Sequence, residues 1–453
     1  MSSEPRNPAV DVGLLAPVST GHDASVRDAA VVDALVTAEV ALVRALATVG
    51  GLEGAVADRV SAAFGWAEGG CREHGVDAAA LAASAVAGGN PVIPLVAEMK
   101  ERGVDPDAVH RGATSQDILD TALMLVSRNA IDEIALSLGR ADAALTSLAR
   151  ENRDVVAAAR TLTQHAVPTT VGARIAGWVR GIRRAAERLR TVQAGLPAQL
   201  GGAAGTLAAF ADEWGPDAAA ALPAAFAADL RLAAPPAPWH TERWPVTELG
   251  DALVQAVDAV GKAASDVALL TRPEIGELAE GRGGGSSAMP QKQNPVASVL
   301  IRSAALRAPQ FGATLHLASA FAVEERPDGA WHAEWPALRE LLRLALGASA
   351  QAAALAEGLV VDRDAVARNL AASHGGILSE RLARVLVPRI GRERFAGLIA
   401  APGSLADAVR ALPEAADLDV DALLDPAGYT GLAAAIVDAT ADTHDDADDD
   451  ADR

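Results

Sequence analysis

Apolar residues recur at intervals of three and four positions along most of the chain. Within residues 23–50, for example, Val31, Leu35, Leu42 and Leu46 share one face of a helix, and a glycine pair ends the pattern. β-branched and aromatic residues nowhere alternate with a period of two, and alanine and leucine, both strong helix formers, are abundant. The pattern predicts an all-α protein.

Several of these helices are expected to be long. Between Ile118 and Glu151 there is no proline and one glycine, and two further helical stretches cover 248–272 and 296–317. Helices of this length are typical of bundles. Breaks near Asp107 and before Val360 divide the chain further, so we expect three helical domains with a central long-helix bundle. The predicted parts are an N-terminal helical domain at 1–108, the bundle domain at 109–358, a C-terminal helical domain at 359–437 and a disordered acidic tail at 438–453.

Charge and composition narrow the classes of function. The 453 residues carry a formal net charge of −20, which argues against nucleic acid or an anionic membrane as a partner. Cys71 is the one cysteine, and no CxxC or HExxH pattern occurs, so no disulfide, metal or cofactor is expected. Gly, Pro or charged residues interrupt every apolar run before it reaches membrane-spanning length, and we expect a soluble cytoplasmic protein.

Chemistry concentrates in residues 283–295, which read GGGSSAMPQKQNP. The glycines favour a loop, in which hydroxyls, backbone N–H groups, the ammonium of Lys292 and the amide of Asn294 can converge on an anion. A nucleotide-binding P-loop does not fit, because Gln291 and Gln293 flank Lys292 where Gly and Ser or Thr are required. The loop therefore predicts a site for a small anion.

This loop resembles the GSSxMPxKxNP signature of the fumarase/aspartase superfamily at all eight specified positions. In that superfamily the loop closes over a substrate carboxylate, and the first serine, here Ser286, acts as general base or acid. The resemblance implies that Lys292 and Asn294 stabilise the enolate-like dianion that forms when a carbon next to a carboxylate loses its proton.

A second candidate segment is HRGATSQDILDT at 110–121. Thr114 followed by Asp117 is a capping-box-like helix start, and the free N–H groups of such a start favour an anion. The segment is similar to one of the superfamily in which Thr and Ser, here Thr114 and Ser115, bind a substrate carboxylate.

The third segment, RTLTQHAVPTTVG at 160–172, resembles the superfamily pattern RTHxQxAxP but departs from it. Leu162 takes the place of the usual His, and His165 follows three positions later. His165 can bind a carboxylate as imidazolium or assist proton transfer. Pro168 suits the first turn of a long helix, which would leave 161–167 as the lead-in to that helix.

The site residues that the resemblance implies are therefore drawn from three segments. It implies catalytic roles for Ser286, His165 and Lys292. It implies substrate contacts for Thr114, Ser115, Gln116, Thr163, Gln164, Ser287, Met289, Asn294 and Arg302. Arg302, Arg307 and Arg326 are candidates for offsetting the remaining charge of the substrate.

Three more segments, GNPVIPLV at 89–96, PWHTER at 238–243 and WHAEW at 331–335, look like segments of the bacterial 3-carboxy-cis,cis-muconate cycloisomerases. This resemblance implies lactonisation of a small tricarboxylate to 4-carboxymuconolactone, in the protocatechuate branch of the β-ketoadipate pathway. It also implies a homotetramer whose active sites are shared between subunits. Such an enzyme can have Leu162 in place of the usual His, because its nucleophile is already an ionised carboxylate and needs no base to activate it. Two alternatives remain open: an adenylosuccinate lyase, which normally has the missing His, and a catalytically silent structural relative.

Overall fold

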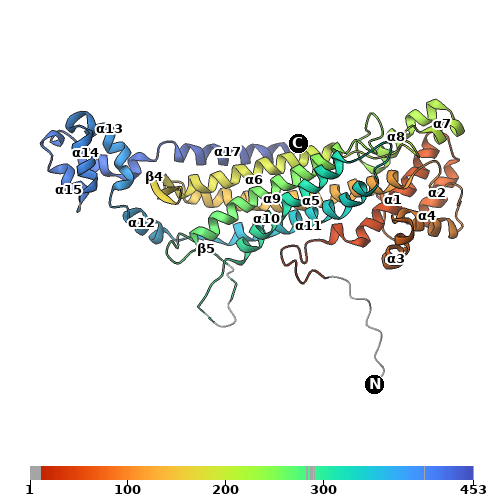
Figure 1. Ribbon diagram of the computed structural model, residues 1–453, viewed down its shortest axis with the longest axis horizontal. Helices are drawn as coiled ribbons and strands as arrows, with labels where there is room; N and C mark the ends of the chain where they lie inside the picture. The colour runs from red at the N-terminus through yellow and green to blue at the C-terminus, as the bar shows by residue number, and fades with distance from the viewer. Residues whose placement is uncertain (1–11, 282–283, 286–288, 290, 402, 452–453) are drawn as a thin grey trace, which may run out of the picture. The chain divides into compact units, whose positions relative to one another are not determined.

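The computed structural model describes residues 12–281, 284–285, 289, 291–401 and 403–451, and side chains up to residue 442. The described chain is built from helices, with strands only in three short ribbons, which confirms the all-α class (Figure 1). It divides into two compact units. Unit 1 comprises Met1–Leu136, Ala185–Asp258 and Ser303–Ala350, and unit 2 comprises Ser137–Arg184, Ala259–Arg302 and Gln351–Arg453. The borders of the units fall inside the five longest helices, so the predicted division into three domains stays a prediction.

The elements have the following bounds. The five longest helices are α5 (Ser115–Glu151), α6 (Val171–Ala194), α9 (Trp244–Leu270), α10 (Val296–Ala320) and α11 (Gly329–Gly358). The other helices of unit 1 are α1 (Asp28–Thr48), α2 (Gly54–Ala63), α3 (Ala78–Gly88), α4 (Val92–Glu101), α7 (Ala208–Trp214) and α8 (Pro216–Leu230), preceded by the 3₁₀ turn η1 (Ala24–Val26). Those of unit 2 are α12 (Arg363–Ala371), α13 (Ser379–Ile390), α14 (Arg392–Ala400), α15 (Leu405–Arg410), α16 (Val420–Leu424) and α17 (Ala433–Ala451), with the 3₁₀ turns η2 (Gly376–Leu378), η3 (Pro413–Ala415) and η4 (Pro426–Tyr429). The antiparallel ribbons pair β1 (Trp66–Ala67) with β2 (Gly70–Cys71), β3 (Val156–Thr161) with β4 (Gln164–Thr170), and β5 (Leu278–Glu280) with β6 (Leu359–Val361).

The centre of the small-helix part of unit 1 is α1, which packs against α2 and α8 (Figure 1). The predicted apolar face is confirmed, since Leu35, Leu42 and Leu46 are fully buried. Among the described residues, no single helix has the length and apolar composition needed to cross a membrane. Helices α3 and α4 meet that test only when taken together, and they are bent by 120° at the break between them.

In unit 2 the β3–β4 hairpin corrects one expectation, because α6 begins at Val171 and not at Pro168. Pro168 lies in β4 opposite Ala158, beside a shift in strand register, where a residue without a backbone N–H is tolerated. Gly172 in the first turn of α6 approaches α5 closely: a Cβ there would lie 2.6 Å from the carbonyl oxygen of Ala149. The chain therefore turns back through a paired hairpin before the helix starts.

Helix α17 corrects the predicted start of the acidic tail. Asp438 accepts two hydrogen bonds from Arg153, at 2.7 and 2.6 Å, and Arg183 donates to the carbonyl oxygen of Thr440 at 2.9 Å. Thr440 and Ala441 are also buried. Residues 438–441 thus belong to a docked helix, because an ion pair and buried side chains hold them in unit 2.

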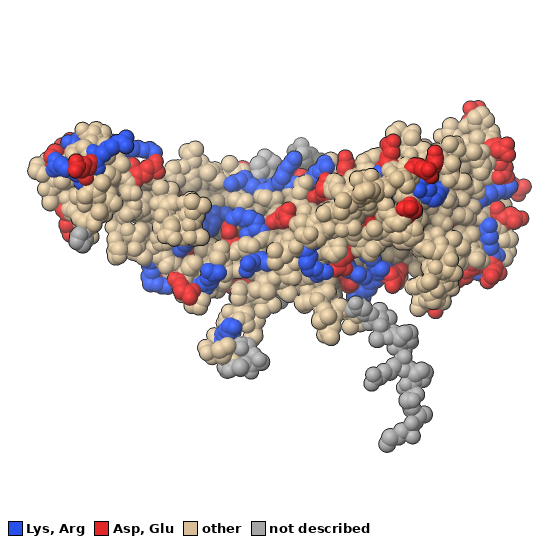
Figure 2. All heavy atoms as spheres, in the orientation of Figure 1, with Lys and Arg blue, Asp and Glu red and all other residues tan. Residues whose placement is uncertain are grey.

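Helices α13 to α15, also in unit 2, enclose a small apolar core centred on Leu382, Leu386 and Val409. Acidic and basic side chains mingle on the surface of this region (Figure 2), and exposed ion pairs such as Arg394 with Glu414 connect them. Exposed pairs of this kind are screened by solvent and contribute little to stability, so the apolar core is what holds these helices together.

Candidate active site

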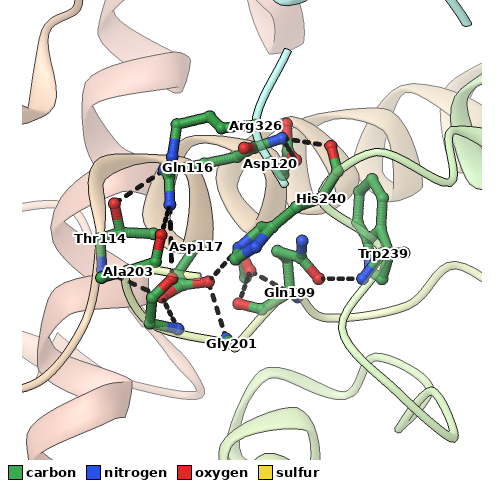
Figure 3. Close-up of polar contacts among 12 residues, drawn as sticks. Thr114, Gln116, Asp117, Asp120, Gln199, Gly201, Ala203, Trp239, His240 and Arg326 are labelled. Carbon is green, nitrogen blue, oxygen red and sulfur yellow. Dashed lines mark hydrogen bonds and ion pairs between the residues drawn. The ribbon is translucent and has the colours of Figure 1, made fainter. Parts of the chain in front are cut away.

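The predicted segment at 110–121 forms the start of α5 in unit 1 (Figure 3). The backbone N–H of Thr114 donates to Asp117 Oδ2 at 3.0 Å, which confirms one half of the predicted capping box. The Thr114 hydroxyl is not used in the cap. Instead, Arg326 donates from Nη1 to Thr114 Oγ1 at 2.8 Å. Since this oxygen accepts from Arg326, its own O–H remains able to donate to a bound anion.

Asp117 is fully buried and holds the start of α5 against two other segments. Besides the Thr114 N–H, its carboxylate accepts from the backbone N–H groups of Gly201 and Gly202, at 2.8 and 2.9 Å, and lies 2.7 Å from His240 Nε2. A Cβ on Gly201 would lie 2.8 Å from His240 Cε1, so only glycine allows this approach. Four donors thus satisfy the Asp117 carboxylate, which makes it a structural anchor.

Of the three arginines considered for the substrate charge, Arg326 is the one that contacts a predicted site residue within the described part of the chain. Its second amino group donates to the carbonyl oxygen of Ala203 at 2.6 Å, which fixes the guanidinium beside Thr114 (Figure 3). Arg307 is paired with a glutamate on α11. Arg302 is exposed and makes no ion pair with any residue whose placement is described. The substrate contact predicted for Arg302 stays a prediction.

A second buried network lies one turn further along α5. Arg243 is 2% exposed and binds two carboxylates: Asp120 at 2.7 and 3.0 Å, and Glu334 at 2.6, 3.1 and 3.1 Å. Trp331 Nε1 donates to Asp120 at 2.9 Å. Burial alone would lower the pKa of Arg243, but Asp120 and Glu334 raise it above its usual range. Burial raises the pKa of Glu334 above its ordinary value, against the opposing effect of Arg243.

Gln116 joins the two networks and is itself fully buried. Its amide donates to Asp120 at 3.1 Å and to the carbonyl oxygen of His240 at 2.8 Å. This donor is used inside the protein, and the substrate contact predicted for Gln116 stays a prediction. Thr114 and Ser115, both half-buried, are the more open members of the segment. The motifs PWHTER and WHAEW are thereby explained: they supply the groups that hold the start of α5.

In unit 2 the predicted segment at 160–172 forms the tip of the β3–β4 hairpin, strand β4 and the first residues of α6. Leu162 and Thr163 adopt positive φ values of 48° and 70°, and Leu162 is 96% exposed. Thr163, Gln164 and His165 line a cavity of about 1120 Å³. The cationic side chains that line the same cavity are Arg160, Arg174, Arg180, Lys262 and Arg272. These five cations outnumber the two acids of the lining, Asp266 and Glu274, which suits an anionic ligand.

A buried glutamate sets the positions of two of those cations. Glu277 accepts from Arg160 at 2.6 and 3.1 Å and from Arg174 at 3.1 Å. Burial alone would raise the pKa of Glu277, but hydrogen bonds from Arg160 and Asn369 and the charge of Arg174 lower it below its ordinary value. Glu277 is therefore a stable anion that orients the base of the hairpin.

The signature loop is described at its two ends. Gly284 and Asn294 exchange backbone hydrogen bonds of 2.9 Å, which closes the base of the loop. Lys292 and Met289 are exposed. Below this bridge, Glu280 at the end of β5 accepts from the N–H groups of Ala297 and Ser298 and from the Ser298 hydroxyl, at 3.1, 2.9 and 2.6 Å.

Two predicted site residues of this loop, Ser286 and Ser287, lie outside the described residues. The structure brings Thr114, Ser115 and Arg326 together in unit 1, and Thr163, Gln164 and His165 together in unit 2. The sharing of active sites between subunits stays a prediction. Within the described part of the chain, no three His, Cys, Asp or Glu side chains form a metal-binding group.

Comparison with known proteins places the chain in a family. The model of a family described as lyase matches residues 22–309. The nitrosuccinate lyase of Streptomyces davaonensis is 45% identical over 95% of this chain and 94% of its own length. The 3-carboxy-cis,cis-muconate cycloisomerase of Bradyrhizobium diazoefficiens is 38% identical over 95% of this chain and 98% of its own length. The crystal structure of the 3-carboxy-cis,cis-muconate lactonizing enzyme from Pseudomonas putida superposes with a TM-score of 0.80, at 35% identity, over 91% of this chain and 94% of that one. With this coverage and the signature loop, the chain belongs to the lyase family of the fumarase/aspartase superfamily.

Proposed function

We propose that the chain catalyses β-elimination on a small polycarboxylate, or the reverse addition, and that the leaving group departs as a stable anion. The contact between Arg326 and Thr114 carries this proposal. It places a cation and a hydroxyl donor at the start of α5, a 37-residue helix whose first N–H groups also favour an anion. Such a set of donors suits one carboxylate of the substrate.

The reaction needs a second set of groups to stabilise the carbanion. Loss of a proton beside a carboxylate spreads negative charge into that carboxylate, and Lys292 and Asn294 are the groups proposed to hold it. Each preorganised donor at such a position typically contributes about 10²–10³ in rate. Ser286 is proposed to take the proton, and since a serine is a weak acid, this requires nearby N–H donors and a cation.

Leu162 favours a leaving group that needs no acid. An amine or hydroxide leaves more easily when a neighbouring acid protonates it, and the superfamily His that could do so is replaced by an apolar, exposed leucine. Nitrite and carboxylate are conjugate bases of much stronger acids than ammonium or water. Both can therefore leave, or add, without protonation.

Two substrates fit this chemistry. Nitrosuccinate is the first candidate, because the nitrosuccinate lyase is 45% identical to this chain. Its elimination removes the proton at one carbon, breaks the C–N bond at the other, and gives nitrite and fumarate. The second candidate is 3-carboxy-cis,cis-muconate, supported by cycloisomerases at 38% identity. Lactonisation adds a carboxylate oxygen to the double bond and protonates the neighbouring carbon, which is the reverse of such an elimination.

A parallel assay tests the proposal and separates the two substrates. The purified protein is given nitrosuccinate, with nitrite and fumarate measured, and 3-carboxy-cis,cis-muconate, with loss of the diene absorbance measured. Adenylosuccinate serves as the comparison substrate and should not be cleaved. Turnover of neither nitrosuccinate nor the muconate would reject the proposed function.

Ser286→Ala tests the proposed base, with Ser287→Ala as the matched control. Ser286→Ala should reduce kcat by more than 10³-fold while the protein stays folded, and Ser287→Ala should retain much more activity. If Ser286→Ala keeps more than about a tenth of the activity, less than about 1.4 kcal/mol of the barrier depends on this hydroxyl, and its role in proton transfer is wrong.

A further inference from the structure

We propose that Glu280 is a positioning residue for the reaction, which fixes the start of α10 and thereby the side chains of Lys292 and Asn294. The proposal rests on the proposed function for the roles of Lys292 and Asn294. Glu280 is the last residue of β5, and α10 begins at Val296, on the other side of the signature loop (Figure 1). Glu280 is not among the predicted site residues.

Helix α10 starts from a residue that cannot cap it. The backbone N–H of Val299 donates to the carbonyl oxygen of Pro295 at 3.0 Å, which is the first hydrogen bond of the helix and puts Pro295 at the N-cap position. An N-cap side chain normally accepts from the N–H groups two or three positions further on, here those of Ala297 and Ser298. Proline has no side-chain oxygen, so these two N–H groups need an acceptor from elsewhere in the chain.

Glu280 supplies that acceptor. Its Oε2 accepts from the N–H of Ala297 at 3.1 Å, and its Oε1 accepts from the N–H and the hydroxyl of Ser298 at 2.9 and 2.6 Å. Ser298 is fully buried, so its donors would have no water to replace a lost acceptor. A carboxylate at the start of a helix is also favoured by the helix dipole. Glu280 therefore takes the place of an N-cap side chain, and it does so from the opposite end of the loop.

Strand β5 holds Glu280 at a fixed place in unit 2. Glu280 pairs with Leu359 of β6, and the next N–H group, that of Gly281, donates to the carbonyl oxygen of Gly358 at 2.7 Å. Leu278 and Leu359, at the two ends of this pairing, are both buried. Glu280 therefore joins the start of α10 to the β5–β6 ribbon, and the ribbon joins it to the end of α11.

This arrangement leaves the side chain of Asn294 available to the substrate. Asparagine beside a helix start commonly uses its side-chain oxygen to cap the helix, but here Glu280 already accepts from the N–H groups in question. Asn294 Nδ2 makes one long hydrogen bond, 3.5 Å to the carbonyl oxygen of Gly285, and Oδ1 has no partner among the described residues. Lys292 forms no ion pair within the same part of the chain and is exposed. The backbone on both sides is held, while the two side chains stay free for an anion.

Asp362 provides a matched control in the same ribbon. It directly follows β6, and its carboxylate accepts from the N–H of Ala365 at 2.9 Å, so it caps α12 as Glu280 caps α10. Both acids thus end a strand of one ribbon and cap a helix of unit 2. Glu280 caps the helix that follows the signature loop, whereas α12 contains none of the predicted site residues.

Kinetics provide the first test, at temperatures well below the melting transitions. Glu280→Ala and Asp362→Ala should lower the melting temperature by similar amounts, because each removes one helix cap. Glu280→Ala should also lower kcat/KM about 10²-fold, the loss expected when reacting groups are misplaced by about 1 Å, and Asp362→Ala should stay within about threefold of the wild type. Glu280→Gln keeps the shape without the charge and should show a smaller loss; it replaces Glu280→Ala if that variant does not fold.

A double-mutant cycle tests whether Glu280 acts through Asn294. Asn294→Ala should lower kcat/KM much less in the Glu280→Ala background than in the wild type, since the amide it removes is already misplaced. Wild-type kcat/KM in both Glu280 variants, or independent losses from Glu280→Ala and Asn294→Ala, would overturn the proposal.

Hydrogen exchange tests the proposal without turnover. Deuterium uptake is followed by mass spectrometry in peptides that cover 291–298. These backbone N–H groups should exchange faster in Glu280→Ala than in the wild type, whereas Asp362→Ala should leave their exchange unchanged. A wild type that turns over neither substrate would reject the proposed function, while the exchange would still decide whether Glu280 fixes this segment. Wild-type exchange at 291–298 in Glu280→Ala would overturn the proposal.

Discussion

Replacing Arg243 with methionine should destabilise the protein far more than removing an exposed ion pair of similar geometry. Methionine fills much of the same volume but removes five hydrogen bonds to two buried carboxylates. Asp120 would keep its donors from Trp331 and Gln116, at 2.9 and 3.1 Å. Glu334 would keep no side-chain donor among the described residues, so the variant leaves it as an uncompensated buried acid.

The expected magnitude follows from this burial. Removing one partner of a buried ion pair costs about 3–5 kcal/mol. Unfolding entropy is about 2.1 cal/mol/K per residue, which over 453 residues gives about 1 kcal/mol/K if the chain unfolds as one unit. The melting temperature should therefore fall by about 3–5 °C at neutral pH.

Arg140→Met is the matched control, because Arg140 binds Glu357 in the same two-pronged way at 2.9 Å, but with side chains 54% and 45% exposed. This variant should lose at most about 1 kcal/mol. Thermal or urea unfolding of both variants against the wild type measures the difference, with coincident spectroscopic signals as the check for two-state behaviour. Equal shifts for Arg243→Met and Arg140→Met would refute the reasoning from burial.

Two further predictions concern unit 2. Glu277→Gln should destabilise the protein by about 2 kcal/mol at pH 7, since hydrogen bonds from Arg160 and Arg174 lose their anionic acceptor. The lowered pKa of Glu277 means that its stabilisation is present above about pH 4.3 and is lost as the pH falls through the folded-state pKa. Urea unfolding between pH 3 and 7 should show the difference from wild type shrinking at low pH, and a constant difference would contradict this. Deleting 443–453 should leave the melting temperature nearly unchanged. Deleting 438–453 should lower it, because the longer deletion also removes a buried threonine and an ion pair. Equal melting temperatures for the two deletions would show that the docking of residues 438–441 does not stabilise the protein.

The sequence was informative where its signals are local. Helix α5 spans Ser115–Glu151, close to the predicted extent, because a capping pattern marks its start and no proline interrupts its apolar spacing. The hairpin at 156–170 was missed, since its two short strands contain alanine, arginine and proline and show no alternation of apolar residues. The pairing between the two strands, rather than the intrinsic strand propensity of their residues, stabilises the hairpin. The same pairing moved the start of the next helix beyond Pro168.

The buried groups of the candidate site could not be placed by spacing in the sequence. Asp120 and Arg243 are 123 positions apart, and an acidic residue on a helix is more often exposed than buried. The signal that could have found them was the combination of PWHTER and WHAEW, two segments rich in charged and aromatic residues without an assigned role.

The local balance of charge, rather than the net charge of −20, determines whether this chain can bind a polycarboxylate. At physiological ionic strength exposed charges are screened over about 8 Å, so the distant acidic surface contributes little at the start of α5. The acids near that point already have hydrogen-bond donors inside the protein: four donors satisfy Asp117, and Asp120 shares Arg243 with a second buried carboxylate. Because these anions already have donors inside the protein, the guanidinium of Arg326 is not needed to balance them. Arg326 can therefore act on the substrate, which is the condition for anion binding inside an acidic protein.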